Sequence, residues 1–280
     1  LPTLARRPVE ETQALTAAYG QVIVDECHHL SAASFELVAR RTKARYVVGL
    51  SATVARKDGH HPIIFMQCGP IRHKAAQPLD APHDLAVMRQ FIESPIALPA
   101  EAGIQDVFRH LAQDAARTAA IASAITDAFR QGCKVLALTE RTEHIDAIRA
   151  ALADHVPEPF VLHGRMSKKQ RAALIAAIDA LSPDAPRLLL ATGKLVGEGF
   201  DHPPLDTLVL AMPVSWKGTL AQYAGRLHRE HASKTDVRII DFVDTGHPAL
   251  LRMWDKRQRG YRAMGYRVDS GAPSVGRFEW

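Results

Sequence analysis

Two adjacent carboxylates, Asp25 and Glu26, follow a short apolar run and precede Cys27 and His28. In an open parallel sheet, ligands collect at the carboxyl ends of the strands, where these two side chains would emerge. One carboxylate can hold Mg²⁺ through its water shell, and the other can orient and deprotonate an attacking water, as phosphate hydrolysis requires. An Asp-Glu pair also occurs at strand ends without a catalytic role, so further motifs must distinguish the two interpretations.

Two hydroxyl residues, Ser51 and Thr53, follow the next apolar run, at 46–50. If that run is the adjacent strand, the hydroxyls can hydrogen-bond to the first strand's carboxylates and sense a bound phosphate. Ser-Ala-Thr by itself indicates only a turn or a helix cap. Its position after Asp25 and Glu26 favours the coupling role.

A glycine-interrupted loop follows a third apolar run, at 187–191. Glycine lets backbone amides approach a ligand closely. The residues of interest in this loop are Thr192, Gly197, Glu198, Gly199 and Asp201. The Thr-Gly-Lys at 192–194 is not a Walker A phosphate loop, because the earlier glycine is missing and Leu195 replaces the hydroxyl residue.

A fourth segment, 222–229, holds an amide and two guanidinium groups. Gln222, Arg226 and Arg229 recur at spacings of four and three, which would place them on one face of a helix. Arginine stabilises the charge that develops on a transferring phosphoryl group, so this segment is a candidate arginine-finger helix. A solvated basic face is the alternative if the other motifs are ignored.

Taken in order, the four segments resemble motifs II, III, V and VI of the superfamily 2 helicases and translocases. The Asp-Glu-Cys-His sequence is similar to the DEAD/DEAH-type helicases related to DNA-repair helicases and type III restriction subunits. The resemblance covers about residues 20–245. It implies two RecA-like domains, with ATP and Mg²⁺ in the cleft and a nucleic-acid strand running across both.

The resemblance also implies a role for each matched residue. Asp25 would hold Mg²⁺ through water, Glu26 would be the general base, Arg226 would be the arginine finger and Arg229 its neighbour. ATP binding and its coupling to movement would fall to His28, Ser51, Thr53, Gly197, Glu198, Gly199, Asp201 and Gln222. Weaker matches at two strand ends would place Thr139, Arg141, His163, Gly164 and Thr192 beside the nucleic-acid backbone. Ordinary strand-end chemistry explains these five residues equally well.

The elements that must position these residues alternate between short apolar runs and helical patterns, which predicts parallel strands covered by crossover helices. We expect strands at 22–24, 46–50, 134–138, 160–162, 187–191, 207–210 and 237–242. We expect helices at 33–41, 110–131, 143–153, 167–181, 218–230 and 247–264, with N-caps at Thr142 and Ser167. The predicted fold class is α/β, with a RecA-like helicase core.

Four parts are expected along the chain. Residues 1–75 would be the C-terminal part of the first RecA-like domain, and 109–245 the complete second domain. Proline-rich 76–108 would be a connector with one possible strand near 84–92, and 246–280 a basic C-terminal helix and tail. No Walker A sequence occurs, so we expect an incomplete first domain and little ATP hydrolysis by this chain alone.

Composition and charge restrict the function further. The chain has 280 residues, 47% hydrophobic and 23% charged, and no apolar stretch approaches the roughly 18 residues of a membrane span. Its three cysteines, at 27, 68 and 133, match neither a disulfide framework nor a zinc motif, which indicates a reducing, cytoplasmic location. The net charge of +5 lies within 252–267, where interleaved aromatic residues could stack on bases or could instead pack inward.

Two functions remain open. The first is an ATP-dependent motor on nucleic acid, with DNA favoured over RNA, working with further domains or subunits of a DNA-repair or defence system. The second is a non-catalytic nucleic-acid-binding module of helicase ancestry. The motor is favoured because Asp25, Glu26, Arg226 and Arg229 are all present.

Overall fold

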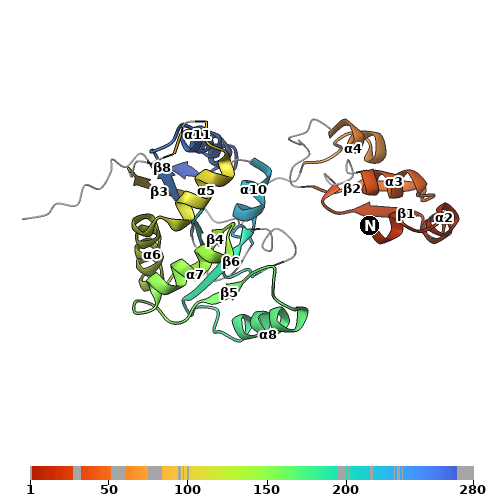
Figure 1. The fold of residues 1–280 in the computed structure, drawn as a ribbon. Helices are drawn as coiled ribbons and strands as arrows, with labels where there is room; N and C mark the ends of the chain where they lie inside the picture. The colour runs from red at the N-terminus through yellow and green to blue at the C-terminus, as the bar shows by residue number, and fades with distance from the viewer. Residues whose placement is uncertain are drawn as a thin grey trace, which may run out of the picture. The chain divides into compact units, whose positions relative to one another are not determined.

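The computed structural model forms two compact units, Leu1–Gln77 and Pro78–Trp280 (Figure 1). It describes residues 2–27, 33–51, 61–74, 84–93, 96, 98–99, 101–193, 200, 202–214, 217–229, 231, 234 and 236–269. Six residues with predicted roles lie outside these ranges: His28, Thr53, Gly197, Glu198, Gly199 and Asp201. No helix in the described ranges is long and apolar enough to cross a membrane.

The first unit contains a two-stranded parallel sheet. Its elements are α1 (Pro2–Ala5), α2 (Val9–Ala17), β1 (Gln21–Val24), α3 (Ala33–Arg41), β2 (Tyr46–Gly49) and α4 (His61–Cys68). Both predicted strands and the predicted helix at 33–41 are confirmed. Helices α2 and α4 were not predicted, because neither sequence has an apolar stripe on one helical face.

One face of this sheet is covered and the other is exposed. Cys27 and Ile64 are buried in a small core with Val24, Phe35, Ala39 and Cys68 packed against them. On the opposite face, Ile23 and Tyr46 are 61% and 55% exposed. Parallel sheets are normally covered on both faces, so this unit leaves apolar strand surface exposed to solvent.

The second unit is built on a seven-stranded, wholly parallel sheet with the strand order β5-β6-β4-β7-β8-β3-β9. The strands are β3 (Asp84–Ile92), β4 (Lys134–Thr139), β5 (Phe160–Leu162), β6 (Arg187–Thr192), β7 (Thr207–Leu210), β8 (Asp236–Asp244) and β9 (Arg267–Val268). Every strand predicted in this region is present. The predicted α/β fold class with parallel sheets is therefore confirmed.

Helices cover both faces of the sheet (Figure 1). They are α5 (Ile104–Gln113), α6 (Ala115–Arg130), α7 (Thr142–Leu152), α8 (Lys168–Asp179), α10 (Lys217–Gly225) and α11 (Pro248–Ala263). Alternate strand residues divide between two cores, because successive strand side chains point to opposite faces. Val135 packs with α6 and α7, whereas Leu136 packs with residues of α8, α10 and α11.

Two helix predictions between residues 110 and 153 need correction. The single helix expected at 110–131 is two helices, because Asp114 has an extended backbone and its side chain accepts a hydrogen bond from Arg117 N as the N-cap of α6. The N-cap of α7 is Arg141, and Thr142 is its first helical residue. The N-cap predicted at Ser167 is confirmed, since its side chain and that of Gln170 form a capping box at the start of α8.

Strand β3 lies inside the stretch that was predicted as a connector. It pairs with β8 along its whole length, from Asp84 opposite Asp236 to Ile92 opposite Asp244, and β9 pairs with its other edge. Its apolar side chains at alternate positions are buried, with Val87 wholly inaccessible to solvent. Residues 84–92 are thus part of the second unit's sheet.

The basic C-terminal helix belongs to the same unit. Trp254, Tyr261 and Tyr266 are buried in its core, so they are not available to stack on bases. Arg257 is also buried and pairs with Asp241, whose carboxylate accepts from Arg257 Nε and Tyr261 Oη at 2.7 Å each. Of the two alternatives for this segment, inward packing of the aromatic residues is confirmed.

Candidate nucleotide and nucleic-acid site

The two carboxylates of the first unit lie directly after β1, and Ser51 lies just after β2. Strands β1 and β2 are parallel and pair from Gln21 opposite Tyr46 onward, so both end at the same edge of the sheet. Hydrogen bonds continue beyond the strand ends, because Leu50 O accepts from Cys27 N at 2.8 Å. This pairing brings the segment of Asp25 and Glu26 beside the segment of Ser51.

Glu26 occupies a strained backbone position. Its φ of 49° is the only positive φ among the described residues other than glycine. The left-handed backbone conformation raises the free energy of any residue that has a Cβ, so neighbouring contacts must hold Glu26 in it. One such contact is the hydrogen bond that Asp25 Oδ1 accepts from Glu26 N at 2.9 Å. Asp25 is exposed, and an exposed carboxylate fits a magnesium ion that keeps its water shell.

In the second unit, the expected arginine helix ends earlier than predicted. Helix α10 ends at Gly225, so Gln222 is helical, whereas Arg226 and Arg229 lie in the turn that follows. The three side chains therefore do not share one helical face, which corrects the spacing argument. Glycine at 225 is a common place for a helix to stop.

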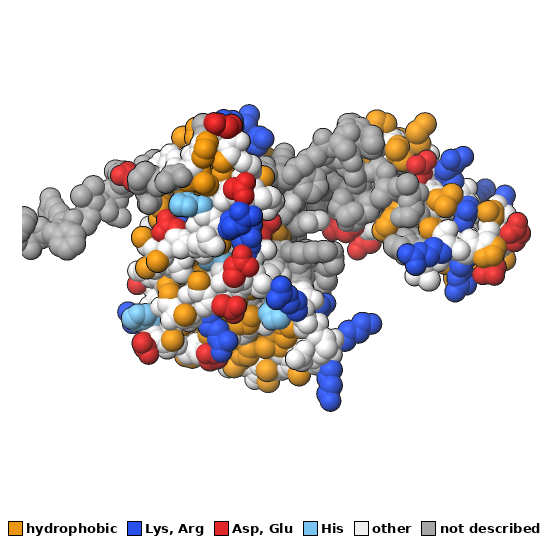
Figure 2. Space-filling model, in the orientation of Figure 1, with side chains coloured by type: hydrophobic (Ala, Val, Ile, Leu, Met, Phe, Trp, Pro, Cys, Tyr) orange, Lys and Arg blue, Asp and Glu red, His pale blue; other side chains and the backbone are white. Residues whose placement is uncertain are grey.

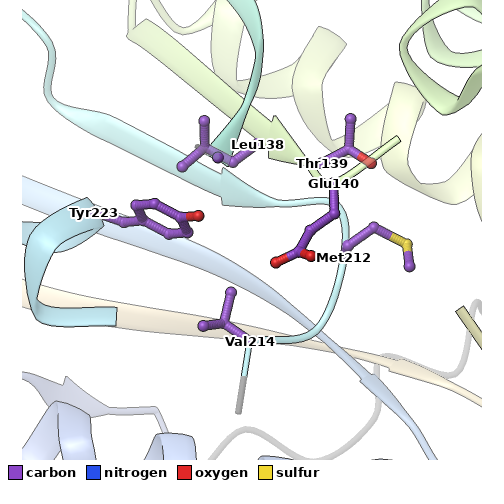
Figure 3. Close-up of a pocket in the computed structure, with 7 residues that line it drawn as sticks. Leu138, Thr139, Glu140, Met212, Val214 and Tyr223 are labelled. Atoms are coloured by element: carbon purple, nitrogen blue, oxygen red, sulfur yellow. The ribbon is translucent and has the colours of Figure 1, made fainter. Parts of the chain in front are cut away.

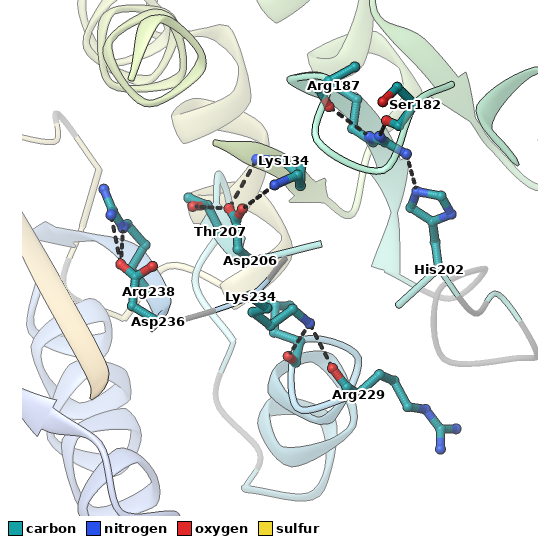
Figure 4. Close-up of polar contacts among 12 residues, drawn as sticks. Lys134, Ser182, Arg187, His202, Asp206, Thr207, Arg229, Lys234, Asp236 and Arg238 are labelled. Atoms are coloured by element: carbon teal, nitrogen blue, oxygen red, sulfur yellow. Dashed lines mark hydrogen bonds and ion pairs between the residues drawn. The ribbon is translucent and has the colours of Figure 1, made fainter. Parts of the chain in front are cut away.

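A lysine satisfies the carbonyls of that turn. Lys234 Nζ donates to Leu227 O at 2.7 Å and to Arg229 O at 2.9 Å (Figure 4). A cation at a helix C-terminus also interacts favourably with the helix dipole. The exposed Arg229 side chain extends away from Lys234 (Figure 4). The hydrogen bond from Lys234 thus restrains the backbone of Arg229.

Tyr223 packs helix α10 against the sheet. This side chain lines a small hollow at the carboxyl ends of β4, β6 and β7, with its hydroxyl toward Glu140 (Figure 3). A Cβ at Gly193 would overlap Tyr223 Oη, so the close approach requires glycine at 193. Burial, and secondarily the Glu140 carboxylate, raise the pKa of Tyr223, so the hydroxyl stays protonated.

The residues predicted to lie beside nucleic acid share one edge of the second sheet. Strands β5, β6 and β4 are neighbours, with Leu162 opposite Ala191 and Thr139 opposite Thr192. His163 and Gly164 follow directly on β5, and Arg141 follows on β4. The register therefore brings the five predicted positions to the carboxyl ends of three adjacent strands.

Two of these residues are already engaged within the protein. Thr139 is buried, and its Oγ1 lies 3.0 Å from Nδ1 of the buried His144. Arg141 pairs with Glu143 at 3.2 Å and donates to Gln105 O at 3.2 Å. In this arrangement Thr139 contacts α7 and not solvent.

Near α8, the carboxyl edge of the second sheet has polar side-chain atoms without partners among the described residues. His163 Nδ1 and Arg171 Nε are buried and have no hydrogen-bond partner among the residues that the structure describes. Arg165, Lys168 and Lys169 are exposed beside them, and Figure 2 shows Lys and Arg side chains protruding over α8. A buried guanidinium nitrogen and a buried ring nitrogen without partners, in a segment with exposed cations, suit a phosphate ligand.

A network that the sequence analysis missed connects α8 and β6 to His202. His202 is buried, and its Nε2 lies 2.9 Å from an Arg187 guanidinium nitrogen (Figure 4). Its Nδ1 lies 3.2 Å from Asp179 Oδ1. Arginine can only donate, so Nε2 accepts and Nδ1 carries the proton. Burial, followed by the nearby Arg187, lowers the pKa of His202 and keeps the ring neutral. No sequence motif contains these three residues, because Asp179, Arg187 and His202 come from separate segments.

Two family models match the chain in separate segments. The model described as "Type III restriction enzyme, res subunit" matches residues 3–56, and "Helicase conserved C-terminal domain" matches residues 117–231. The first segment contains Asp25 and Glu26, and the second ends two residues after Arg229. Both models therefore include the segments whose geometry is described above.

The full-length relatives and solved structures agree with these matches. Helicase D10 of Escherichia phage T5, a provisional name, is 26% identical over 92% of this chain and 56% of its own length. L396 of Acanthamoeba polyphaga mimivirus, provisionally named an ATP-dependent RNA helicase, is 24% identical over 89% of this chain and 48% of its own length. The chain thus spans about half the length of these two relatives.

The fold is that of the RecA-like helicase domains. The ATP-dependent Type ISP restriction-modification enzyme LlaBIII, solved bound to DNA, matches with a TM-score of 0.61 and 15% identity over 96% of this chain and 23% of LlaBIII. Dbp5 of S. cerevisiae, solved with RNA and ADP BeF3, matches with a TM-score of 0.54 and 13% identity over 89% of this chain and 59% of Dbp5. The chain thus resembles the superfamily 2 helicases in both matched segments.

Proposed function

We propose that this chain is the part of an ATP-dependent helicase or translocase that contains motifs II to VI, and that it acts on DNA. The observation that carries the proposal is the strand register, which brings Asp25, Glu26 and Ser51 to the carboxyl edge of one parallel sheet and the residues after β4, β5 and β6 to the carboxyl edge of the other. The match of residues 3–56 to a restriction-enzyme subunit supports DNA as the substrate. The name of L396 and the RNA in the Dbp5 structure support RNA, so the substrate needs a direct test.

In the proposed reaction, Asp25 would hold a hydrated Mg²⁺ and Glu26 would take the proton of the attacking water. Asp25 is exposed at the end of β1, and the turn at Glu26 places a second carboxylate beside it. Bound MgATP supplies the phosphoryl group and the ion that neutralises its charge. Arg226 and Arg229, in the turn after α10, would stabilise the developing negative charge.

We further propose that nucleic acid lies along the edge of β5 and α8. The buried nitrogens of His163 and Arg171 and the exposed Arg165, Lys168 and Lys169 support this placement. Contacts of this kind bind phosphates and carry no base information, so binding should depend strongly on salt and weakly on sequence.

Glu26→Gln tests the motor directly, in a longer form of the protein that includes a phosphate-binding loop. The amide keeps the shape of the side chain and removes the base, so we expect ATP turnover to fall by about 10²–10⁴-fold with nucleotide binding retained. Glu10→Gln, an exposed change on α2, is the matched control and should have no effect. Turnover near that of the unaltered protein in Glu26→Gln would remove Glu26 from this role.

Arg226 and Arg229 are tested in the same protein by separate changes to alanine. An arginine finger contributes roughly 10³–10⁵-fold to turnover, so the variant that removes it should lose most ATPase activity while binding nucleotide within a modest factor of the unaltered protein. Arg252→Ala, on the exposed side of α11, is the control. The assignment of this turn is wrong if both single variants keep full activity.

Binding of nucleic acid is measured on the 280-residue chain itself, by fluorescence anisotropy with single-stranded DNA and RNA of one sequence. Lys168→Ala and Lys169→Ala should each weaken binding and lower the slope of log affinity against log salt by about one ion. Tighter binding to RNA would overturn the choice of DNA. The second candidate is a non-catalytic nucleic-acid-binding module of helicase ancestry, which would be supported by tight binding without turnover in the longer protein.

A further inference from the structure

Two cysteine sulfurs of the first unit meet above a glycine. Cys27 follows Glu26, and Cys68 is the last residue of α4. A Cβ built on Gly49 would lie 2.9 Å from Cys27 Sγ and 2.9 Å from Cys68 Sγ. Real Cβ atoms do not approach neighbours so closely, so the two sulfurs flank the space that a side chain at 49 would occupy. The two sulfurs are therefore close neighbours, on either side of the space that a Cβ at 49 would fill.

The packing around the pair differs between its two members. Cys27 is 4% exposed and lies in the small core with Ile64 of α4, whereas Cys68 is at the edge of that core and is partly exposed. Burial raises the pKa of both thiols, and the charge of Cys68 raises the pKa of Cys27 further. Reagents from solution therefore reach Cys68 first, and reaction should be faster at alkaline pH, where more thiolate forms.

We propose that Cys27 and Cys68 are a redox-active pair that closes to a disulfide. Cys68 thiolate attacks one sulfur of a small-molecule disulfide such as oxidised glutathione, forming a mixed disulfide and releasing one thiolate. Cys27 thiolate then attacks the Cys68 sulfur and expels the second small thiolate. Two protein thiols are oxidised, one small disulfide is reduced to two thiols, and the two protons of the cysteines pass to the released thiolates.

The bond would tie the turn after β1 to the end of α4. Glu26 is adjacent to Cys27 and has the strained φ of 49°, so fixing Cys27 restricts the backbone of Glu26. Oxidation should then slow ATP turnover, a consequence that rests on the proposed function of Glu26. The disulfide itself does not rest on that function, because its formation is measured without nucleotide.

The test equilibrates the 280-residue chain with mixtures of reduced and oxidised glutathione. Free thiols are blocked with N-ethylmaleimide in denaturant, and peptides are mapped by mass spectrometry. We expect a cross-linked peptide containing Cys27 and Cys68 to increase with the share of oxidised glutathione and to form faster at pH 8.5 than at pH 7. Cys133, buried in the other unit, should remain free and serves as the internal control.

Three variants complete the design. Cys133→Ser should leave the cross-link unchanged, and Cys68→Ser should leave Cys27 alkylated under every mixture. Gly49→Ala places a methyl group between the sulfurs and should lower the cross-linked fraction, provided that hydrogen exchange in α3 shows the unit still folded. The proposal fails if Cys68 carries only glutathione, if both cysteines stay free in pure oxidised glutathione, or if folded Gly49→Ala forms the bond as readily as the unaltered chain. If the disulfide forms but ATP turnover is not slowed, the proposed effect on Glu26 is wrong, whereas the proposed disulfide is supported.

Discussion

His144 should make the second unit sensitive to mild acid. Its side chain is wholly buried on α7, with Nδ1 3.0 Å from Thr139 Oγ1, and Nε2 has no hydrogen-bond partner among the described residues. Burial, followed by the nearby Arg117, lowers the pKa of His144 to about 4. An imidazolium at this position would have an N–H group with no described acceptor, so the folded protein favours the neutral ring.

The size of the effect follows from the two pKa values. The unfolded chain binds the His144 proton below a pH of about 6.5, and the folded protein binds it only below about 4. The free energy of unfolding therefore falls as the pH drops below about 6.5, and the loss is complete below about 4. Between pH 7 and pH 5 this one group should lower stability by about 2 kcal/mol.

His144→Gln removes the titration and keeps a side chain that can hydrogen-bond to Thr139. Stability is followed by hydrogen exchange of peptides from β4 at pH 7 and pH 5, corrected for intrinsic exchange rates. The unaltered protein should lose about 2 kcal/mol more than His144→Gln between these pH values. His155→Gln, an exposed change just beyond α7, should behave like the unaltered protein. Equal losses in His144→Gln and the unaltered protein would refute the reasoning.

Two further changes probe the contacts that hold the second unit together. Arg117→Met removes the bidentate partner of the buried Asp244, so we expect unfolding in urea to show a loss of about 3–5 kcal/mol, whereas Arg109→Met at an exposed pair should cost about 0–1 kcal/mol. Similar losses in both variants would contradict this account. Gly193→Ala should displace the Tyr223 side chain and raise the rate of hydrogen exchange in α10. Adding Tyr223→Leu should reverse part of that rise. Unchanged exchange in Gly193→Ala would show that the close approach of Tyr223 to residue 193 is not needed.

Most strands of both sheets could be predicted because each is a short apolar run, whereas the two-residue β9 was not predicted. Runs such as 187–191 and 207–210 are buried on both faces, and parallel strands under two helix layers have this composition. The role of β3 could not be predicted, since its partners β8 and β9 lie far along the chain and pairing leaves no local signal. Similarly, the separation of α5 from α6 could not be predicted, because the sequence pattern is helical throughout and only the extended backbone of Asp114 divides the two helices.

The sequence predicted which segments form the candidate site better than it predicted how their side chains are arranged. The register of β1 and β2 places Asp25 and Ser51 at one edge, as expected from parallel strands. The placement of Arg226 and Arg229 on a helical face was wrong, because spacing predicts a face only where the helix continues. The roles of these residues stay predictions. The His202 network was missed because its three members have no spacing in common and meet only in the folded protein.

The pairing of β3 with β8 has a consequence for the order in which the protein is made. Asp84 and its partner Asp236 are 152 positions apart, so β3 leaves the ribosome long before the strand that will cover its edge exists. At roughly 5–20 residues per second, this delay is about 8–30 s. During this delay, Leu85 and Val87 cannot be buried in the completed sheet, although both are core residues of the folded protein. Newborn chains of this protein should therefore depend on chaperones until translation has passed β8, and ribosome pausing within that interval should increase aggregation.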